Sequence, residues 1–159
     1  MKIIKPVLLL ALLFCTSCKK ENDYGYQLQD VNVKQTGSDK SNSKSTTEFI
    51  SIAYSDLFGV SISQSDLVKL NTVYSAFGDK KLIEDRIIRN FLNASGAQIP
   101  SVIGTDTTYF INKAYKKFYN REPNAFESYY IKQQIKLNSA INPLVIYYSL
   151  MTSDEYRYY

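Results

Sequence analysis

The chain has 159 residues, and its 19 Lys and Arg against 15 Asp and Glu side chains give a formal net charge of +4. It contains no histidine, and its only two cysteines, Cys15 and Cys18, lie near the N-terminus. These counts exclude Ser–His and Cys–His catalysis and histidine-ligated zinc or haem, and so small a charge excess is not typical of a nucleic-acid-binding protein. We therefore expect no catalytic residue, no metal, no cofactor and no nucleic-acid partner.

Residues 1–17 have the features of a secretory signal peptide. Lys2 and Lys5 form a basic start, and an unbroken apolar run extends from Val7 to Phe14. That run is much shorter than the roughly 20 residues of a transmembrane helix, so we interpret it as a secretion signal. Losing its two lysines would leave 17 basic and 15 acidic side chains, a net charge near +2.

The apolar run ends in Thr16-Ser17-Cys18, and the sequence then turns polar. This ending resembles a lipobox, the signal at which bacteria acylate a cysteine and cleave just before it, although Cys15 stands where leucine is usual. The resemblance implies that Cys18 carries a lipid that holds the protein at the outer membrane, on its periplasmic or cell-surface face. The alternative is an ordinary secreted protein in which Cys18 has no such role.

Residues 18–45 are predicted to be the acylated cysteine and a flexible tether, and residues 46–159 to be one compact all-α domain. The tether is rich in Ser, Asn, Gln, Asp and Lys, so it holds too few apolar residues to offset the entropy of ordering. The domain has apolar residues at helical spacing throughout.

Polar N-cap residues predict where six helices of this domain begin. The expected caps are Ser45, Ser63, Asp79, Asp106, Asn124 and Asn142, and a last short turn follows Ser153. Helix ends are expected at Gly59, Gly78, Gly96 and Asn120.

The six predicted helices form two related sets of three, repeat one in residues 46–96 and repeat two in residues 106–159. Four apolar residues of the first helix, Phe49, Ile50, Ala53 and Tyr54, recur as Phe110, Ile111, Ala114 and Tyr115 at an offset of 61. The third helices match at an offset of 59. This pattern predicts an internal duplication, with the matched apolar residues facing the core.

The second half contains a spaced set of motif residues, which are Tyr115, Phe118, Arg121, Pro123, Ser153, Glu155 and Tyr156. On these residues it resembles a small helical repeat of unknown function in bacterial secreted proteins, and it is similar to the linker domains of phycobilisomes. Tyr119-Asn120 replaces the usual Leu-Gly, and the first half lacks the Arg and the Pro. The resemblance carries no catalytic residue. It implies that Tyr156 packs inward and that Glu155 or Asp154 meets Arg121. Arg121 could instead cap helix carbonyls or contact an anion or a partner.

The 14 tyrosines supply the best candidates for a contact surface, because tyrosine combines a flat apolar face with one polar group. We expect partner contacts at Tyr129, Tyr148, Tyr158 and Tyr159, the last two lying beyond the motif. The predicted function is a non-enzymatic accessory or scaffold subunit of a larger envelope complex, and the alternative is a lipoprotein that binds a glycan or a peptide. Five lysines (Lys113, Lys116, Lys117, Lys132 and Lys136) make the fourth and fifth helices basic, which suits either an anionic lipid or an ordinary solvated face.

Overall fold

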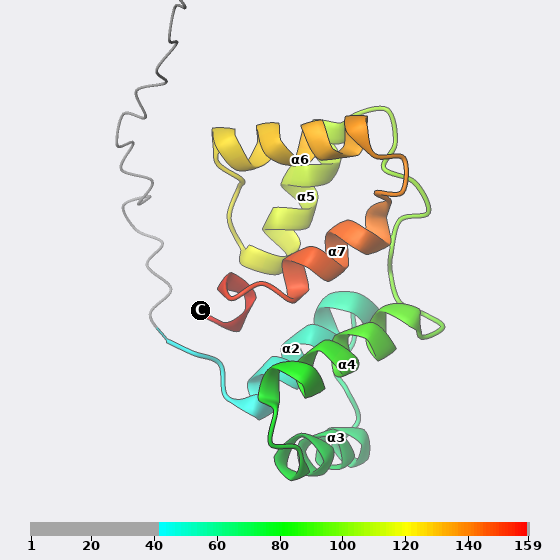
Figure 1. The fold of residues 1–159 in the computed structure, drawn as a ribbon. Helices are drawn as coiled ribbons and strands as arrows, with labels where there is room; N and C mark the ends of the chain where they lie inside the picture. The colour runs from blue at the N-terminus through cyan, green and yellow to red at the C-terminus, as the bar shows by residue number, and fades with distance from the viewer. Residues whose placement is uncertain (1–41, 159) are drawn as a thin grey trace, which may run out of the picture. The chain divides into compact units, whose positions relative to one another are not determined.

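The computed structural model describes residues 42–158, which form six α-helices and a C-terminal 3-10 turn (Figure 1). The elements are α2 (Thr46–Phe58), α3 (Gln64–Ala76), α4 (Lys80–Asn93), α5 (Thr107–Tyr119), α6 (Ala125–Leu137), α7 (Pro143–Met151) and η2 (Glu155–Arg157). Within this range the β-type pairing is limited to one isolated antiparallel bridge, between Ser43 and Tyr158. The predicted all-α fold is therefore confirmed. The signal peptide, Cys18 and residues 19–41 of the predicted tether lie outside the described residues.

The helices begin at the predicted polar caps. The side chains of Ser45, Ser63, Asp79, Asp106, Asn124 and Asn142 each accept a hydrogen bond from a backbone N–H in the first helical turn. Ser45 and Asn124 form complete capping boxes with the glutamates three residues on. Gly59 ends α2 with a left-handed φ of 70°, and Asn120 ends α5 with a φ of 55°, as expected for residue types that tolerate this conformation.

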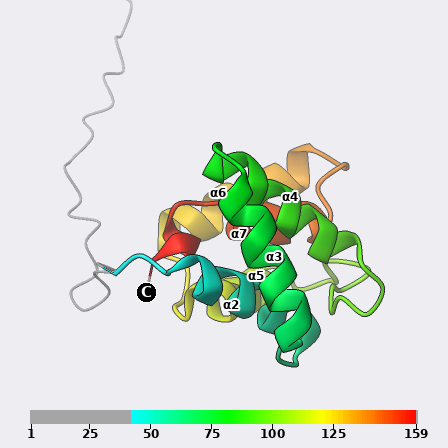
Figure 2. The ribbon, with the colours of Figure 1, turned by 90° about the horizontal axis from the view of Figure 1, so that it is seen from below.

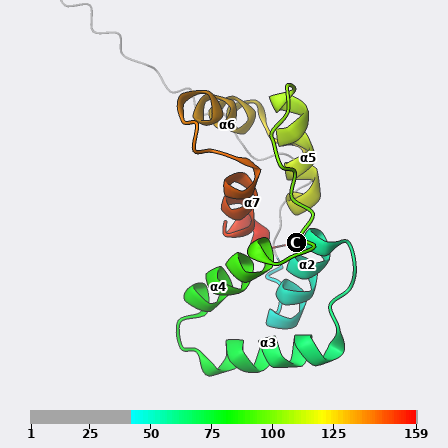
Figure 3. The ribbon, with the colours of Figure 1, turned by 90° about the vertical axis from the view of Figure 1, so that its right-hand side faces the viewer.

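The two sets of three helices meet at their third members. Helices α4 and α7 pack against each other, while α3 packs mainly on α2 and α6 on α5. Helices α3 and α6 lie at opposite ends of this arrangement in two perpendicular views (Figures 1 and 3). Four of the five matched third-helix pairs point inward, namely Ile87 and Ile146, Ile88 and Tyr147, Phe91 and Leu150, Leu92 and Met151. The fifth pair, Leu82 and Ile141, does not, because Leu82 is exposed. This agreement is what a duplication predicts; common descent of the halves stays a prediction.

The second helix of each set departs from the predicted burial. Tyr74 is the one buried residue of α3, and α6 has none. The helical spacing of apolar residues predicts that Val73 of α3 and Phe77, directly after it, face the core, but both are exposed. The reason is positional: a helix at the end of the domain has a neighbour on one side, so part of its apolar surface has nothing to cover it within residues 42–158.

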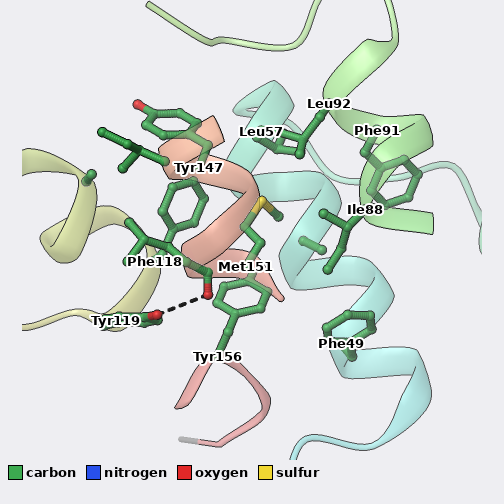
Figure 4. Packing of buried hydrophobic residues seen from close by; sticks show 14 of the residues in the cluster. Phe49, Leu57, Ile88, Phe91, Leu92, Phe118, Tyr119, Tyr147, Met151 and Tyr156 are labelled. Carbon is green, nitrogen blue, oxygen red and sulfur yellow. Dashed lines mark hydrogen bonds between the residues drawn. The ribbon is translucent and has the colours of Figure 1, made fainter. Parts of the chain in front are cut away.

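The core lies between α2, α4, α5 and α7 (Figure 4). Its largest fully buried side chains are Phe49, Ile50, Leu57, Ile88, Ile111, Met151 and Tyr156. Tyr156 belongs to η2, so the C-terminal turn contributes directly to the core.

Candidate functional site: the C-terminal clasp and the aromatic surface of α6

Arg121 lies between α5 and α6 and ties the C-terminal turn to the start of α6. Its Nε and Nη2 donate to the carboxylate oxygens of Glu155 at 2.6 and 2.7 Å. Its Nη1 and Nη2 donate to the carboxylate oxygens of Glu127 at 2.8 and 2.7 Å. The expected contact between Arg121 and Glu155 is thus present. Asp154, the other expected partner, instead pairs with Lys81 at 2.7 Å.

The electrostatics of this cluster favour the charged forms of both partners. The hydrogen bonds that Arg121 donates to Glu127 and Glu155 raise its pKa. Burial opposes ionisation of Glu127, but the hydrogen bonds from Arg121 and from the Asn124 backbone outweigh it and lower the pKa of that carboxyl. Because every nitrogen of the guanidinium already donates to an oxygen of the chain, we assign Arg121 a structural role.

Tyr156 forms the centre of a second cluster, which we call the C-terminal clasp (Tyr156 with Lys44 and Asp56). Its ring is completely buried and meets Phe49 of α2 and Phe118 of α5 edge-on, each at 6.0 Å between centroids (Figure 4). The Tyr156 hydroxyl donates to Asp56 at 2.6 Å, and burial raises the pKa of Asp56. The predicted inward packing of Tyr156 is confirmed.

Lys44 completes the clasp from the N-terminal side. Its Nζ lies 4.2 Å from the centre of the Tyr156 ring and donates to the Tyr156 carbonyl, and its backbone N–H donates to the Arg157 carbonyl at 2.8 Å. Figure 2 shows the cyan segment that leads into α2 beside the red C-terminal turn. The predicted tether boundary at residue 45 is therefore too late, because Ser43 and Lys44 already belong to the folded part.

Ser153 and Tyr119 fix the turn between α7 and η2. The Tyr119 hydroxyl donates to the Leu150 carbonyl at 3.0 Å (Figure 4), and the Ser153 hydroxyl donates to the same carbonyl at 2.8 Å. The Ser153 hydroxyl also accepts from the Tyr156 backbone N–H. Burial raises the pKa of Tyr119 to about 12. Tyr119 thus takes part in the same turn as the motif residue Ser153, and Pro123 lies half-buried in the loop before α6.

The four tyrosines predicted to contact a partner have different surroundings. The Tyr148 hydroxyl donates to Asp85 and accepts from Arg89, both of α4, so Tyr148 links the two halves internally and is not a free contact residue. Tyr158 is 40% exposed, but its backbone pairs with Ser43. Tyr159 lies outside the described residues. Tyr129, on α6, is 62% exposed.

Tyr129 belongs to a larger group that we call the α6 aromatic surface: Phe126, Tyr129, Tyr130 and Leu137. Their exposed fractions are 73, 62, 53 and 77%. The spacing of three, four and seven residues puts them on one helix face, and the Phe126 and Tyr130 rings stack at 6.1 Å between centroids. Ile131 and Ile135 cover the other face by packing on the core. Helix α6 is thus apolar on both sides.

Sequence reasoning missed Lys44, Asp56 and most of the α6 aromatic surface. Asp56 carried a usable signal, because it is an acidic residue directly before the buried Leu57 in an apolar helix. The sequence pattern of the α6 face was ambiguous, since the spacing of Phe126 and Tyr130 fits a core-facing stripe as well as an exposed one.

A cleft of about 480 Å³ lies beside the clasp and is lined by Phe49, Tyr74, Glu84, Met151, Arg157 and Tyr158, among others. Arg157 pairs with Glu84 at 2.7 Å, and the Tyr74 hydroxyl donates to the same carboxylate at 2.8 Å. Glu84 thus pairs with Arg157 and accepts from Tyr74, and these contacts along the cleft join α3 and α4 to the C-terminal turn. Residues 42–158 contain no cluster of metal-ligating side chains, and none of their helices has the length and apolarity needed to span a membrane.

Comparison with protein-family models, with curated proteins and with solved structures found no match to this chain. The likeness to the bacterial repeat and to the phycobilisome linkers thus rests on the motif residues alone and stays a prediction.

Proposed function

We propose that this protein is a non-enzymatic lipoprotein of the outer membrane that acts as an accessory or scaffold subunit of a larger envelope complex. The observation that carries the proposal is the α6 aromatic surface. Four large apolar side chains on one face of one helix are unusual on a protein that has no partner, because contiguous exposed apolar patches usually mark contact sites.

The composition of this surface suits a protein partner. Tyrosine and phenylalanine are enriched in interface cores, where they bury a large area at a low cost in side-chain entropy. Lys132 and Lys136 stand four residues apart on α6 and, from their spacing, lie along the edge next to Tyr129. An apolar centre with a basic edge fits a partner surface that is apolar with acidic residues at its rim.

Photo-crosslinking in living cells tests this contact directly. With a photoreactive phenylalanine analogue in place of Tyr129, we expect an adduct with one discrete envelope protein. The matched control carries the same analogue at Val68, an exposed apolar position of α3, and should give no such adduct. Adding Phe126→Ser and Tyr130→Ser should abolish the Tyr129 adduct with a change in unfolding free energy below about 1 kcal/mol, since both side chains are exposed. Equal adducts from both positions would contradict the proposal.

The stacked rings of Phe126 and Tyr130 also favour a second candidate, a glycan- or peptide-binding lipoprotein. Mild detergent should extract such a protein from the membrane without a bound partner protein. Its melting temperature should rise when a member of a glycan panel is added. Tyr129→Ser should then reduce that rise, whereas Val68→Ser should not.

The membrane anchor is tested at Cys18. Cys18→Ala should leave an unacylated and uncleaved precursor and abolish labelling by a palmitate analogue, because the thiol is the acylated group. Cys15→Ala is the matched control and should label as the wild type does. Incorporation of lipid by the Cys18→Ala variant would contradict the assignment of Cys18 as the acylated residue of a lipobox.

A further inference from the structure

One face of α5 carries a row of basic side chains, which we call the α5 basic stripe: Lys113, Lys116 and Lys117, with Tyr109 at its start. Tyr109, Lys113 and Lys116 stand three or four residues apart and so share the outer side of the helix, and the half-buried Lys117 lies at its edge, while Phe110, Ile111 and Ala114 face the core. Tyr109 is 64% exposed. The stripe borders a shallow open hollow that Asn112 and Glu122 also line.

The charge of the α5 basic stripe is only partly balanced within residues 42–158. No carboxylate of that range lies within ion-pair distance of the three ammonium groups, whereas Lys69, Lys81 and Arg89 of the first half each form an ion pair. The segment from α5 to the end of α6 holds six basic and two acidic side chains. The corresponding segment from α2 to the end of α3 holds one basic and three acidic ones.

The stripe also lies close to the point at which the chain enters the domain. Asp56 of α2 interacts electrostatically with Lys44, the second residue of the folded part, and with Lys117, the last residue of the stripe. Burial and the charge of Lys113 lower the pKa of Lys117, although Asp56 acts in the opposite direction. Lys44, near the start of the described residues, therefore lies near one end of the stripe.

We propose that the α5 basic stripe lies on the anionic headgroups of the membrane that holds the lipid on Cys18, an inference that rests on the lipid anchor of the proposed function. Residues 19–42 connect Cys18 to the domain, and 24 residues span at most about 80 Å when fully extended. The anchor keeps the stripe within that distance of the bilayer, so that weak contacts suffice for binding. The α6 aromatic surface stays available for a protein partner.

Lysines with one neighbouring tyrosine match the chemistry of a lipid surface. Lysine presents a compact ammonium charge on a long apolar stem, and tyrosine is favoured at the boundary between headgroups and acyl chains. Each lysine close to an anionic bilayer strengthens binding roughly fivefold. Recognition of a nucleic acid would call for a larger basic surface than three lysines.

Lysine footprinting on the full chain tests the proposal. The purified protein is reconstituted in vesicles of phosphatidylcholine alone, or of phosphatidylcholine and phosphatidylglycerol in equal parts, and its lysines are acetylated and located by mass spectrometry. We expect Lys113 and Lys116 to react roughly fivefold more slowly in the anionic vesicles, and high salt to remove the difference. Lys69 and Lys81, exposed lysines of α3 and α4, serve as internal controls and should react at the same rate in both vesicles.

Equal rates for the stripe lysines in both vesicles would overturn the proposal, and so would equal protection by double-stranded DNA added in place of the vesicles. A Lys113→Gln variant should show less protection of Lys116, whereas a Lys69→Gln, Lys81→Gln variant should keep it. The intact mass reports acylation of Cys18 separately. Unacylated protein mixed with the same vesicles therefore distinguishes a failed anchor from a failed contact surface.

Discussion

Replacing Tyr156 by alanine should lower the free energy of unfolding by about 4 kcal/mol, in the range measured for the loss of a buried aromatic ring. The side chain is completely buried between Phe49 and Phe118, so its removal leaves a cavity where the two halves meet. It also leaves the half-buried carboxyl of Asp56 without its hydrogen bond. Since domains are stable by about 5–15 kcal/mol, the loss should be evident in urea unfolding curves.

Two variants separate the contributions of the ring and the hydroxyl. Tyr156→Phe keeps the ring and should lower the free energy of unfolding by about 1.5 kcal/mol, because it leaves a partly buried hydrogen-bond acceptor, the Asp56 carboxyl, unsatisfied. Tyr129→Ala removes an exposed tyrosine of α6 and should change the stability by less than about 0.5 kcal/mol. A loss below about 1 kcal/mol for Tyr156→Ala would show that the C-terminal turn is not part of the core.

Alkaline pH should unfold the domain abruptly, because five of its tyrosines are buried, four of them in α5, α7 and η2. Burial raises the pKa of Tyr115, Tyr119, Tyr147 and Tyr156 above the ordinary value of 10.0, and that of Tyr119 to about 12. These phenols ionise at lower pH in the unfolded chain than in the folded one. Between pH 10 and about 12 the folded state thus holds more protons, and the free energy of unfolding falls as pH rises.

The free energy of unfolding should fall steeply as the pH rises. Each such tyrosine contributes up to about 1.4 kcal/mol per pH unit, so four together contribute up to about 5 kcal/mol per unit. Phenolate absorbance and far-ultraviolet dichroism, followed together, should show these four tyrosines ionising in the same transition in which helix is lost. Tyr119→Phe should make that transition less steep and move it to higher pH, unless the lost hydrogen bond to Leu150 outweighs the gain. Ionisation of all 14 tyrosines in a chain that stays helical would refute this account of their burial.

The sequence by itself determined the helices, where they begin and, for α2 and α5, where they end; α3 and α4 end at Ala76 and Asn93, before the expected Gly78 and Gly96. Their caps are local chemistry, in which a polar side chain accepts from a backbone N–H two or three residues on, so Ser45 and Asn124 could be read directly from their capping boxes. The contact between Arg121 and Glu155 was predicted from a motif, although the residues lie 34 positions apart. The left-handed ends at Gly59 and Asn120 followed from residue type in the same way.

Only the tertiary structure decided which apolar faces are covered. Helix α6 is apolar on two sides, and periodicity cannot tell the side that meets a neighbour from the side that meets solvent, so Ile131 is covered by the core while Phe126 is exposed. The same limit applies to Tyr148, whose hydroxyl meets Asp85 of α4 63 residues away, and to Lys44, which joins Tyr156 across 112 residues. A contact of this kind depends on how helices distant in sequence pack together, and no local pattern of residues encodes it.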